Sequence, residues 1–491
     1  MLLKNMLDGL KHELVLGDVN IDITSVHQDS RKIEKGSLFI AVKGFQSDGH
    51  KYINKAMDSG VRAIVVTEVE TDCVNRAKNE SITLIKVDDD RYAMSHLASA
   101  FNKNPSEDMT VIGLTGTNGK TSTCRIISDM LNSVGISTGL LGTIANEIGG
   151  KTYKASLTTP EPVELHGLLK LMKDDKIQAC VMEASSHALD LKRVDHVAFD
   201  YGVFTNLTED HLDYHENFES YYKAKAKLFA LAGQGRLINV DDVYGKRLYE
   251  ECVSDNSTAR VYSYAIDRQA DIRAENVQYT GTGSRFTLVT PSGQVDIKVP
   301  LPGKIYVYNT LAAFGLLAMM DLSLQLIQKA SKAISPVPGR MELVKAKHPV
   351  RVFVDYAHTP DALSNVIDIA RSITDGRVIT VFGCGGDRDT GKRPIMGRIA
   401  EDKSDVIYVT SDNPRTEKPE SIINDVLAGL KSPDRAFVEE RRKQAIGMAI
   451  REARFGDVVL ITGKGHETYQ EINGVRYDFD DRLIALEYLE A

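Results

Sequence analysis

The residues with the clearest chemical meaning form a short loop between an apolar run and a helical pattern. The loop consists of Thr115, Gly116, Thr117, Asn118, Gly119, Lys120 and Thr121. A glycine-containing turn from a strand into a helix can direct backbone N–H groups and a lysine ammonium at nucleotide phosphates. The hydroxyl of Thr121 is then free to bind Mg²⁺. The loop therefore predicts ATP binding, although Leu114 stands where a strict phosphate-loop motif has its first glycine.

Two hard metal ligands follow further apolar runs of the same part of the chain. Glu183 ends the run at residues 180–182, and His211 follows the run at residues 201–204. In an open α/β sheet, the loops at the carboxyl ends of the strands converge on the ligand crevice. Taken singly, Glu183 is interpreted as a solvated loop charge and His211 as a turn or capping residue. Their shared position beside the phosphate loop predicts a common Mg²⁺ site.

Four polar motifs follow apolar runs in the last third of the chain. They contain His358, Arg388, Asp412, Asn413, Pro414, Arg415, Gly463 and Glu467. Each motif alone is consistent with an ordinary turn. Together they place two guanidinium groups and two carboxylates at successive strand ends of one sheet. Such a set suits a zwitterion that carries both ammonium and carboxylate groups.

The elements that must position these residues form three blocks. Residues 1–104 contain short strand and helix candidates and end at an Asn-Pro step that favours extended backbone. Residues 105–335 alternate apolar strands with helices, which indicates βαβ units and a largely parallel sheet. Within them, residues 286–299 alternate like an antiparallel hairpin. Residues 336–491 follow a proline-rich linker and predict a second α/β unit, so we expect an α/β protein with three domains of these limits.

The composition excludes several classes of function. The chain has 491 residues, of which 42% are hydrophobic and 26% charged, as expected for a multidomain soluble protein. A net charge of −8 argues against nucleic-acid binding. The five scattered cysteines show no metal or disulfide spacing, and no signal peptide or membrane-spanning run is predicted. We therefore expect a cytoplasmic protein that does not insert into membranes.

These motifs, in this order, resemble those of the Mur ligases of peptidoglycan synthesis, in particular the members that add the third residue of the peptide. The likeness covers almost the whole chain. It includes residues 29–31, 36–39 and 48–50, the phosphate loop, residues 158–160, 183–187 and 205–211, and the motifs of the last block. The resemblance implies a uridine-binding N-terminal domain, a central P-loop ATPase domain and a C-terminal Rossmann-like domain that binds the incoming amino acid.

The resemblance also implies roles for individual residues. In the family, the counterpart of Lys225 is carbamylated by CO2, and the carbamate would hold a second Mg²⁺ together with Glu183 and His211. From spacing alone, Lys225 is one of several lysines on the charged face of a helix predicted at residues 221–229. The counterparts of Asn309 and Arg340 contact ATP. The counterparts of Ser30, Thr158, Thr159, Ser185 and Arg193 contact the UDP-muramoyl substrate.

The segment at residues 412–415 resembles the signature of members that add meso-diaminopimelate. Arg415 would pair with its distal carboxylate, which L-lysine lacks, so lysine would leave the arginine unpaired. The implied reaction joins this amino acid to the γ-carboxylate of UDP-MurNAc-L-Ala-D-Glu through an acyl phosphate, with Lys120, Glu183, His211 and Lys225 as the implied catalytic residues. His358 is a candidate base. A monomer is expected, with roles in cell-wall synthesis, cell shape and cell division.

Alternative functions remain open at this point. Addition of L-lysine is the nearest one. A P-loop switch protein would need neither the C-terminal ligand motifs nor the N-terminal block, and the motif at residues 412–415 opposes a folylpolyglutamate synthetase. Three departures from the family pattern, at Leu157, Leu191 and residues 303–306, concern local nucleotide and sugar contacts rather than the reaction.

Overall fold

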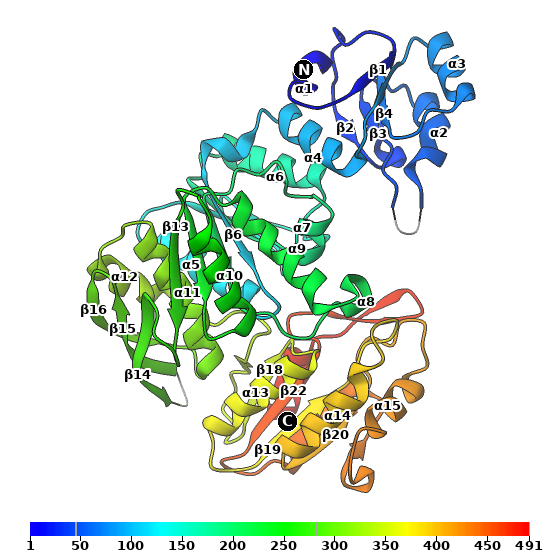
Figure 1. The fold of residues 1–491 in the computed structure, drawn as a ribbon. Coiled ribbons are helices and arrows are strands. Elements are labelled where there is room, and N and C mark those ends of the chain that lie inside the picture. Colours follow the sequence, from blue (N-terminus) through cyan, green and yellow to red (C-terminus); the bar gives the residue numbers. More distant parts are fainter. Residues whose placement is uncertain (45–46, 281–282, 491) are drawn as a thin grey trace.

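The computed structural model describes residues 1–44, 47–280 and 283–490, and three successive parts of the chain each carry a sheet (Figure 1). The first sheet has the order β1-β5-β4-β3-β2. Its strands are β1 (Glu13–Leu16), β2 (Val26–His27), β3 (Leu38–Ile40), β4 (Ala63–Val66) and β5 (Thr83–Lys86). The accompanying helices are α1 (Leu3–Met6), α2 (Ile53–Asp58), α3 (Thr71–Asn79) and α4 (Asp90–Phe101).

The second sheet is the largest and has the order β16-β15-β14-β13-β12-β11-β6-β10-β7-β8-β9. Its parallel strands are β6 (Thr110–Thr115), β7 (Thr138–Leu141), β10 (Ala179–Glu183), β11 (Tyr201–Phe204), β12 (Gly235–Asn239), β13 (Arg260–Ala265) and β14 (Ile272–Thr280). Antiparallel strands extend both edges: β8 (Asn146–Ile148), β9 (Lys151–Tyr153), β15 (Gly283–Thr290) and β16 (Gly293–Val299). The predicted hairpin at residues 286–299 is therefore confirmed, and it continues this sheet.

The helices of this second part are α5 (Lys120–Ser133), α6 (Pro162–Asp174), α7 (Ser186–Asp190), α8 (Leu212–His215), α9 (Phe218–Leu231), α10 (Val243–Ser254), α11 (Lys304–Met319) and α12 (Leu324–Ala330). The strand β6 lies between β10 and β11, and its residues Val111, Ile112 and Leu114 are fully buried. Strands covered on both faces need continuous apolar runs, which is the pattern that made them visible in the sequence.

The third sheet has the order β17-β18-β22-β19-β20-β21. Its strands are β17 (Glu342–Leu343), β18 (Arg351–Asp355), β19 (Val378–Phe382), β20 (Val406–Val409), β21 (Phe437–Val438) and β22 (Val458–Thr462), and only β17 is antiparallel to its neighbour. The helices are α13 (Pro360–Ser372), α14 (Lys392–Lys403), α15 (Pro419–Leu427), α16 (Arg442–Glu452) and α17 (Asp481–Glu490). A separate hairpin joins β23 (Tyr469–Ile472) to β24 (Val475–Asp478). The α/β class is therefore confirmed.

Neighbouring parts of the chain contact each other, and the second and third parts line two clefts together. Helix α4 packs against α6, and Figure 1 shows the third part of the chain below the second. Residues at the starts of α8 and α13 line the same cleft between these two parts. Among the described helices, none is long and apolar enough to cross a membrane. All five cysteines are free thiols.

Candidate active site

The phosphate loop lies between β6 and α5, and two glycines determine its shape. Gly116 has a φ of 146° and Gly119 has a φ of 87°, a region that side chains disfavour. A Cβ at Gly116 would also meet the hydroxyl of Thr205, and one at Gly119 would lie 2.5 Å from Oδ1 of Asn309. The two positions therefore require glycine both for backbone conformation and for close approach.

Two residues at the end of β11 hold the loop in place. The backbone N–H of Thr117 donates to the carbonyl of Asn206 (2.8 Å), and that of Asn118 donates to Oδ1 of Asn206 (2.9 Å). The hydroxyl of Thr205 donates to the carbonyl of Asn118 at 2.6 Å. The loop is thus fixed by hydrogen bonds from the next strand, which preorganises it for a ligand.

Two lysines meet beneath the loop. Nζ of Lys120 donates to the carbonyls of Gly116 (2.8 Å) and Thr117 (2.9 Å), and Nζ of Lys225 donates to the same Gly116 carbonyl at 2.8 Å. Lys225 is only 1% exposed, and its Nζ lies 4.4 Å from the ring centroid of Tyr221. Burial, followed by the charge of Lys120, lowers the pKa of Lys225 well below its usual value. The interpretation of this lysine as part of a solvated charged face is therefore wrong.

Glu183 accepts hydrogen bonds from two threonines beside the loop. The hydroxyl of Thr121 donates to its Oε1 (3.0 Å) and Oε2 (3.1 Å). The backbone N–H of Thr143 donates to Oε1 at 2.8 Å, and its hydroxyl to Oε2 at 3.1 Å. Because Glu183 is 1% exposed, it is not the solvated charge that its loop position allowed. Its carboxylate and the Thr121 hydroxyl therefore place oxygen atoms side by side, and oxygen is the donor that Mg²⁺ prefers.

A cleft of about 560 Å³ collects most of the residues predicted to bind ATP and metal. It is lined by Thr117, Asn118, Gly119, Lys120, Thr121, Glu183, His211, Asn309, Arg340 and His358, together with Thr158. One wall is apolar and includes Ile305, Val366 and Ile369. Gly116, in the loop, and Lys225, which donates to its carbonyl, do not line the cleft. Its combination of polar loop and apolar wall fits a nucleotide.

His211 and His358 are the two predicted histidines of this cleft. His211 caps α8 in the left-handed region and is half exposed, with Nε2 3.4 Å from Oδ2 of Asp210. Desolvation lowers the pKa of His211. Desolvation, followed by the charge of Lys392, lowers the pKa of His358, whose Nδ1 lies 2.9 Å from the carbonyl of Tyr356. An Nδ1–H that donates to this carbonyl leaves Nε2 as the acceptor of a neutral ring.

Of the five residues predicted to contact the UDP-muramoyl substrate, four lie close together: Thr158, Thr159, Ser185 and Arg193. The Thr159 hydroxyl donates to the carbonyl of Glu183 (2.8 Å) and lies 3.2 Å from the hydroxyl of Ser185. Arg193 donates to the Thr159 carbonyl (3.3 Å), and the hydroxyl of Thr143 donates to that of Thr158 (3.1 Å). The fifth residue, Ser30, lies in the first part of the chain, where η1 (Ser30–Lys32) carries it. No described contact joins Ser30 to the other four.

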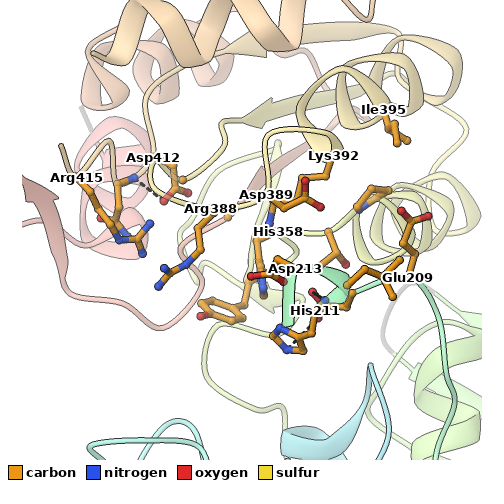
Figure 2. A pocket seen from close by; sticks show the side chains of 18 of the residues that line it. Glu209, His211, Asp213, His358, Arg388, Asp389, Lys392, Ile395, Asp412 and Arg415 are labelled. Carbon is orange, nitrogen blue, oxygen red and sulfur yellow. Dashed lines mark hydrogen bonds and ion pairs between the residues drawn. The ribbon is translucent and has the colours of Figure 1, made fainter. Parts of the chain in front are cut away.

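A second cleft, of about 380 Å³, contains the predicted amino-acid ligands except Pro414. They are Arg388, Asp412, Asn413, Arg415, Gly463 and Glu467. Figure 2 shows Arg388 and Arg415 entering from loops of the third sheet, while His211 and Asp213 enter from the second part of the chain. The Arg415 guanidinium donates to the carbonyl of Gly386 at 2.6 Å. Pro414 contributes backbone close to Gly386.

The two clefts adjoin, because the same residues line both. These are His187, Asp210, His211, Tyr356, His358, Thr359 and Arg388. Nδ2 of Asn118, in the phosphate loop, also donates a 2.7 Å hydrogen bond to Oδ2 of Asp361 in the first turn of α13. A molecule in one cleft is thus next to a molecule in the other.

Comparisons with known proteins follow the same division of the chain. The family models match as follows: Mur ligase family, catalytic domain, at residues 22–102; Mur ligase middle domain, at 114–317; and Mur ligase, glutamate ligase domain, at 339–465. A relative from Clostridium acetobutylicum is 43% identical over 492 residues, covering 100% of this chain and 99% of its own. The chain belongs to the Mur ligase family.

Similar members of the Mur ligase family share one enzyme name. The relatives from C. acetobutylicum and Clostridioides difficile are both named UDP-N-acetylmuramoyl-L-alanyl-D-glutamate–2,6-diaminopimelate ligase. The second is 44% identical and covers 100% of this chain and 99% of its own. A solved structure of a ligase with that name is 30% identical, has a TM-score of 0.71, and covers 97% of each chain. The three-domain Mur ligase architecture is thereby confirmed.

Several residues that shape this Mur ligase site were missed by the sequence reasoning. Thr143 binds Glu183, Asp361 binds the phosphate loop, and Lys392 lines the second cleft. Thr143 follows β7, and Asp361 lies in the first turn of the helix that follows β18. Their positions after the carboxyl ends of strands could have identified both as site residues. No signal distinguished Lys464, a fully buried lysine that contacts Asn413 and Glu467.

Proposed function

We propose that this chain catalyses the ATP-dependent addition of meso-diaminopimelate to UDP-MurNAc-L-Ala-D-Glu in peptidoglycan synthesis. The observation that carries the proposal is the junction of the two clefts, where the cleft of the phosphate loop adjoins a pocket that contains Arg388, Arg415, Asp412 and Glu467. The relatives that match the whole chain carry this activity in their names. A P-loop switch protein would have no use for the second cleft.

The reaction has two chemical steps. An oxygen of the D-glutamate γ-carboxylate attacks the γ-phosphorus of ATP, so that an acyl phosphate forms and ADP leaves. The amino group of the incoming amino acid then attacks the acyl carbon. The tetrahedral intermediate loses inorganic phosphate and a proton, leaving an amide. The first step needs ATP next to the γ-carboxylate, and the second needs the amino group next to the acyl phosphate, so positioning of the three substrates supplies much of the rate.

The proposed phosphate ligands are Gly116, Thr117, Asn118, Gly119, Lys120 and Thr121. Their backbone N–H groups lie at the start of α5, where the helix dipole favours anions. The Lys120 ammonium now donates to loop carbonyls, and phosphate oxygens would replace them as acceptors. Asn309 and Arg340 line the same cleft and would contact the rest of the nucleotide.

Thr121 and Glu183 are the proposed Mg²⁺ ligands, and their chemistry fits this ion. Mg²⁺ binds oxygen, using one or two carboxylates with substrate phosphates and water. Among the described residues, no group of three or more His, Cys, Asp or Glu is spaced to hold a metal, so phosphate oxygens and water would complete the shell. Bound there, Mg²⁺ would supply positive charge beside the transferring phosphoryl group. His211 is proposed for a second ion.

Lys225 is proposed to carry a carbamate formed with CO2. The free amine, not the ammonium, reacts with CO2, and burial beside Lys120 favours the free amine. A carbamate would replace one positive charge by a negative one, which turns repulsion from Lys120 into attraction. It would also offer oxygen ligands near Glu183 and His211.

The second cleft is proposed to bind the incoming amino acid. Arg388 and Arg415 would bind carboxylates, and Asp412 and Glu467 would bind ammonium groups, with Asn413, Pro414 and Gly463 shaping the pocket. His358 is the proposed base, because its neutral ring leaves Nε2 available as an acceptor. Lysine lacks the distal carboxylate and would leave one guanidinium without its partner.

The first part of the chain is proposed to bind the uridine end of the second substrate. The proposed ligands of this substrate are Ser30, in the first part, and Thr158, Thr159, Ser185 and Arg193, in the second part. We infer domains at residues 1–104, 105–335 and 336–491, a division supported by the three separate sheets. We also infer a monomer in the cytoplasm, where both nucleotide substrates occur, with a role in cell shape and division.

The proposal is tested by the products of one incubation. Purified enzyme with ATP, Mg²⁺, UDP-MurNAc-L-Ala-D-Glu and meso-diaminopimelate should yield ADP, phosphate and the UDP-tripeptide, identified by mass spectrometry. ADP and phosphate without a new amide would contradict a ligase. Preferential formation of an amide with L-lysine would show that the enzyme adds L-lysine and not meso-diaminopimelate.

A further inference from the structure

Lys464 is a charged residue with no contact to solvent. It follows β22, between Gly463 (φ 115°) and Gly465 (φ 53°), and it is 0% exposed. A fully buried lysine is rare unless its ammonium is paired. Nζ of Lys464 donates to Oδ1 of Asn413 and to Oε2 of Glu467, both at 3.0 Å. Asn413 and Glu467, which accept hydrogen bonds from the Lys464 ammonium, both line the second cleft.

The three residues close a triangle of hydrogen bonds. Nδ2 of Asn413 donates to Oε2 of Glu467 at 2.9 Å, so this one oxygen accepts from both neighbours. Oδ1 of Asn413 also accepts from the backbone N–H of Glu471 at 2.9 Å, which ties the triangle to β23. Among the described residues, none donates to Oε1 of Glu467, although Glu467 lines the cleft. One carboxylate oxygen is thus held inward while the other is available to a ligand.

We propose that Lys464 is a positioning residue of the amino-acid pocket, which fixes Asn413 and Glu467 so that Oε1 of Glu467 accepts an ammonium group of the incoming diamino acid. The inference rests on the proposed function, because it assigns a partner within that pocket. Arg415, on the same motif as Asn413, lines the same cleft and takes the carboxylate.

The alternative is that Lys464 only stabilises the connection between β22 and β23. Removing one partner of a buried ionic network leaves the other charges unpaired, so a change at Lys464 would disturb either function. A structural role lowers the folded fraction and hence kcat for all substrates alike. A positioning role raises KM for one substrate. The two are separated by measuring KM for each of the three substrates.

The variants are Lys464→Met, Glu467→Gln and the double variant, with Lys443→Met as the control. Lys443 is half exposed on α16 and pairs with Glu487, away from both clefts. We expect Lys464→Met to raise KM for meso-diaminopimelate by about tenfold or more. KM for ATP and for the UDP substrate should stay within about twofold of wild type. The double variant should raise KM for diaminopimelate no more than the larger single change, because both act through one carboxylate.

Each result of these measurements either supports or overturns the inference about Lys464. An unchanged KM for diaminopimelate, equal changes for all three substrates, or single effects that multiply would overturn the inference. If Lys464→Met does not fold, as judged by thermal unfolding, Lys464→Gln retains one donor in the same space and carries the same test. Wild-type enzyme that makes no amide with diaminopimelate would instead overturn the proposed function, so the two failures are distinguishable.

Discussion

Lys120 and Lys225 donate to one acceptor, the carbonyl oxygen of Gly116, each at 2.8 Å. Two ammonium groups on one carbonyl repel each other, and this repulsion is the second cause of the lowered pKa of Lys225, after burial. The arrangement is unfavourable for two cations and favourable for a cation beside an anionic carbamate.

The first prediction concerns the carbamate. Lys225→Ala should lose nearly all activity, and a short-chain carboxylic acid that enters the vacated space should restore part of it. Lys223→Ala, a change to an exposed lysine on the same helix, is the control. Rates are compared with and without the acid. Full activity of Lys225→Ala without any acid would contradict the proposed role.

The second prediction concerns the Mg²⁺ ligands. Thr121→Val removes the hydroxyl that contacts Glu183 while keeping the size of the side chain. We expect the Mg²⁺ concentration for half-maximal rate to rise about 10- to 100-fold. Thr123→Val is the matched control, because the buried hydroxyl of Thr123, on the same helix, has no hydrogen-bond partner within the described part of the chain. Equal Mg²⁺ requirements in both variants would remove Thr121 from the site.

The third prediction concerns the bond between the phosphate loop and α13. Asp361→Ala removes one hydrogen-bond acceptor of Asn118, and this bond contributes about 1 kcal/mol to the contact between the second and third parts of the chain. Small-angle scattering without nucleotide should then give a larger radius of gyration than for wild type. Asp368→Ala, on the same helix, removes a pair with Lys403 that lies within the third part of the chain, and should leave the radius unchanged. Identical radii for all three proteins would show that the bond does not hold the parts together.

The fourth prediction concerns a buried histidine near the packing of α4 on α6. His166 is 0% exposed, neither ring nitrogen has a hydrogen-bond partner among the residues that the structure describes, and burial lowers its pKa to about 3. Between its ordinary value of 6.5 and this lowered value, the unfolded chain binds a proton that the native chain does not. Stability is therefore fully present above pH 6.5 and is lost as the pH falls through this window.

His166→Leu should accordingly flatten the acid side of the stability profile. At neutral pH it should also stabilise the fold by about 1 kcal/mol, because it removes buried polar atoms without partners. Thermal unfolding between pH 7 and pH 4 measures both effects, with the exposed His12→Leu as control. A profile as steep as that of wild type would show that His166 is not responsible for acid sensitivity.

The fifth prediction concerns the choice of amino acid. Arg415→Met should lower kcat/KM for meso-diaminopimelate by on the order of 10²-fold, because the distal carboxylate loses a charged partner. The rate with L-lysine should change much less. The ratio of the two kcat/KM values is the measurement. An equal loss for both amino acids would assign Arg415 to a shared carboxylate instead.

Much of this architecture could be predicted from the sequence, because parallel strands buried on both faces are continuous apolar runs. The same rule located Glu183 and Arg388, which follow such runs. Burial of individual polar residues could not be predicted. Lys225 lies on a helix with exposed lysines on either side, and only the packing of α9 against the phosphate loop distinguishes it. Lys464 likewise lies in a short motif, and its partner Asn413 is 51 positions away in the sequence.

Phosphate release by the wild-type enzyme, with each substrate omitted in turn, tests the central claim most directly. We predict release only when ATP, UDP-MurNAc-L-Ala-D-Glu and an amino acid are all present, and a higher kcat/KM with meso-diaminopimelate than with L-lysine. Release from ATP alone, at the rate of the complete mixture, would contradict the account.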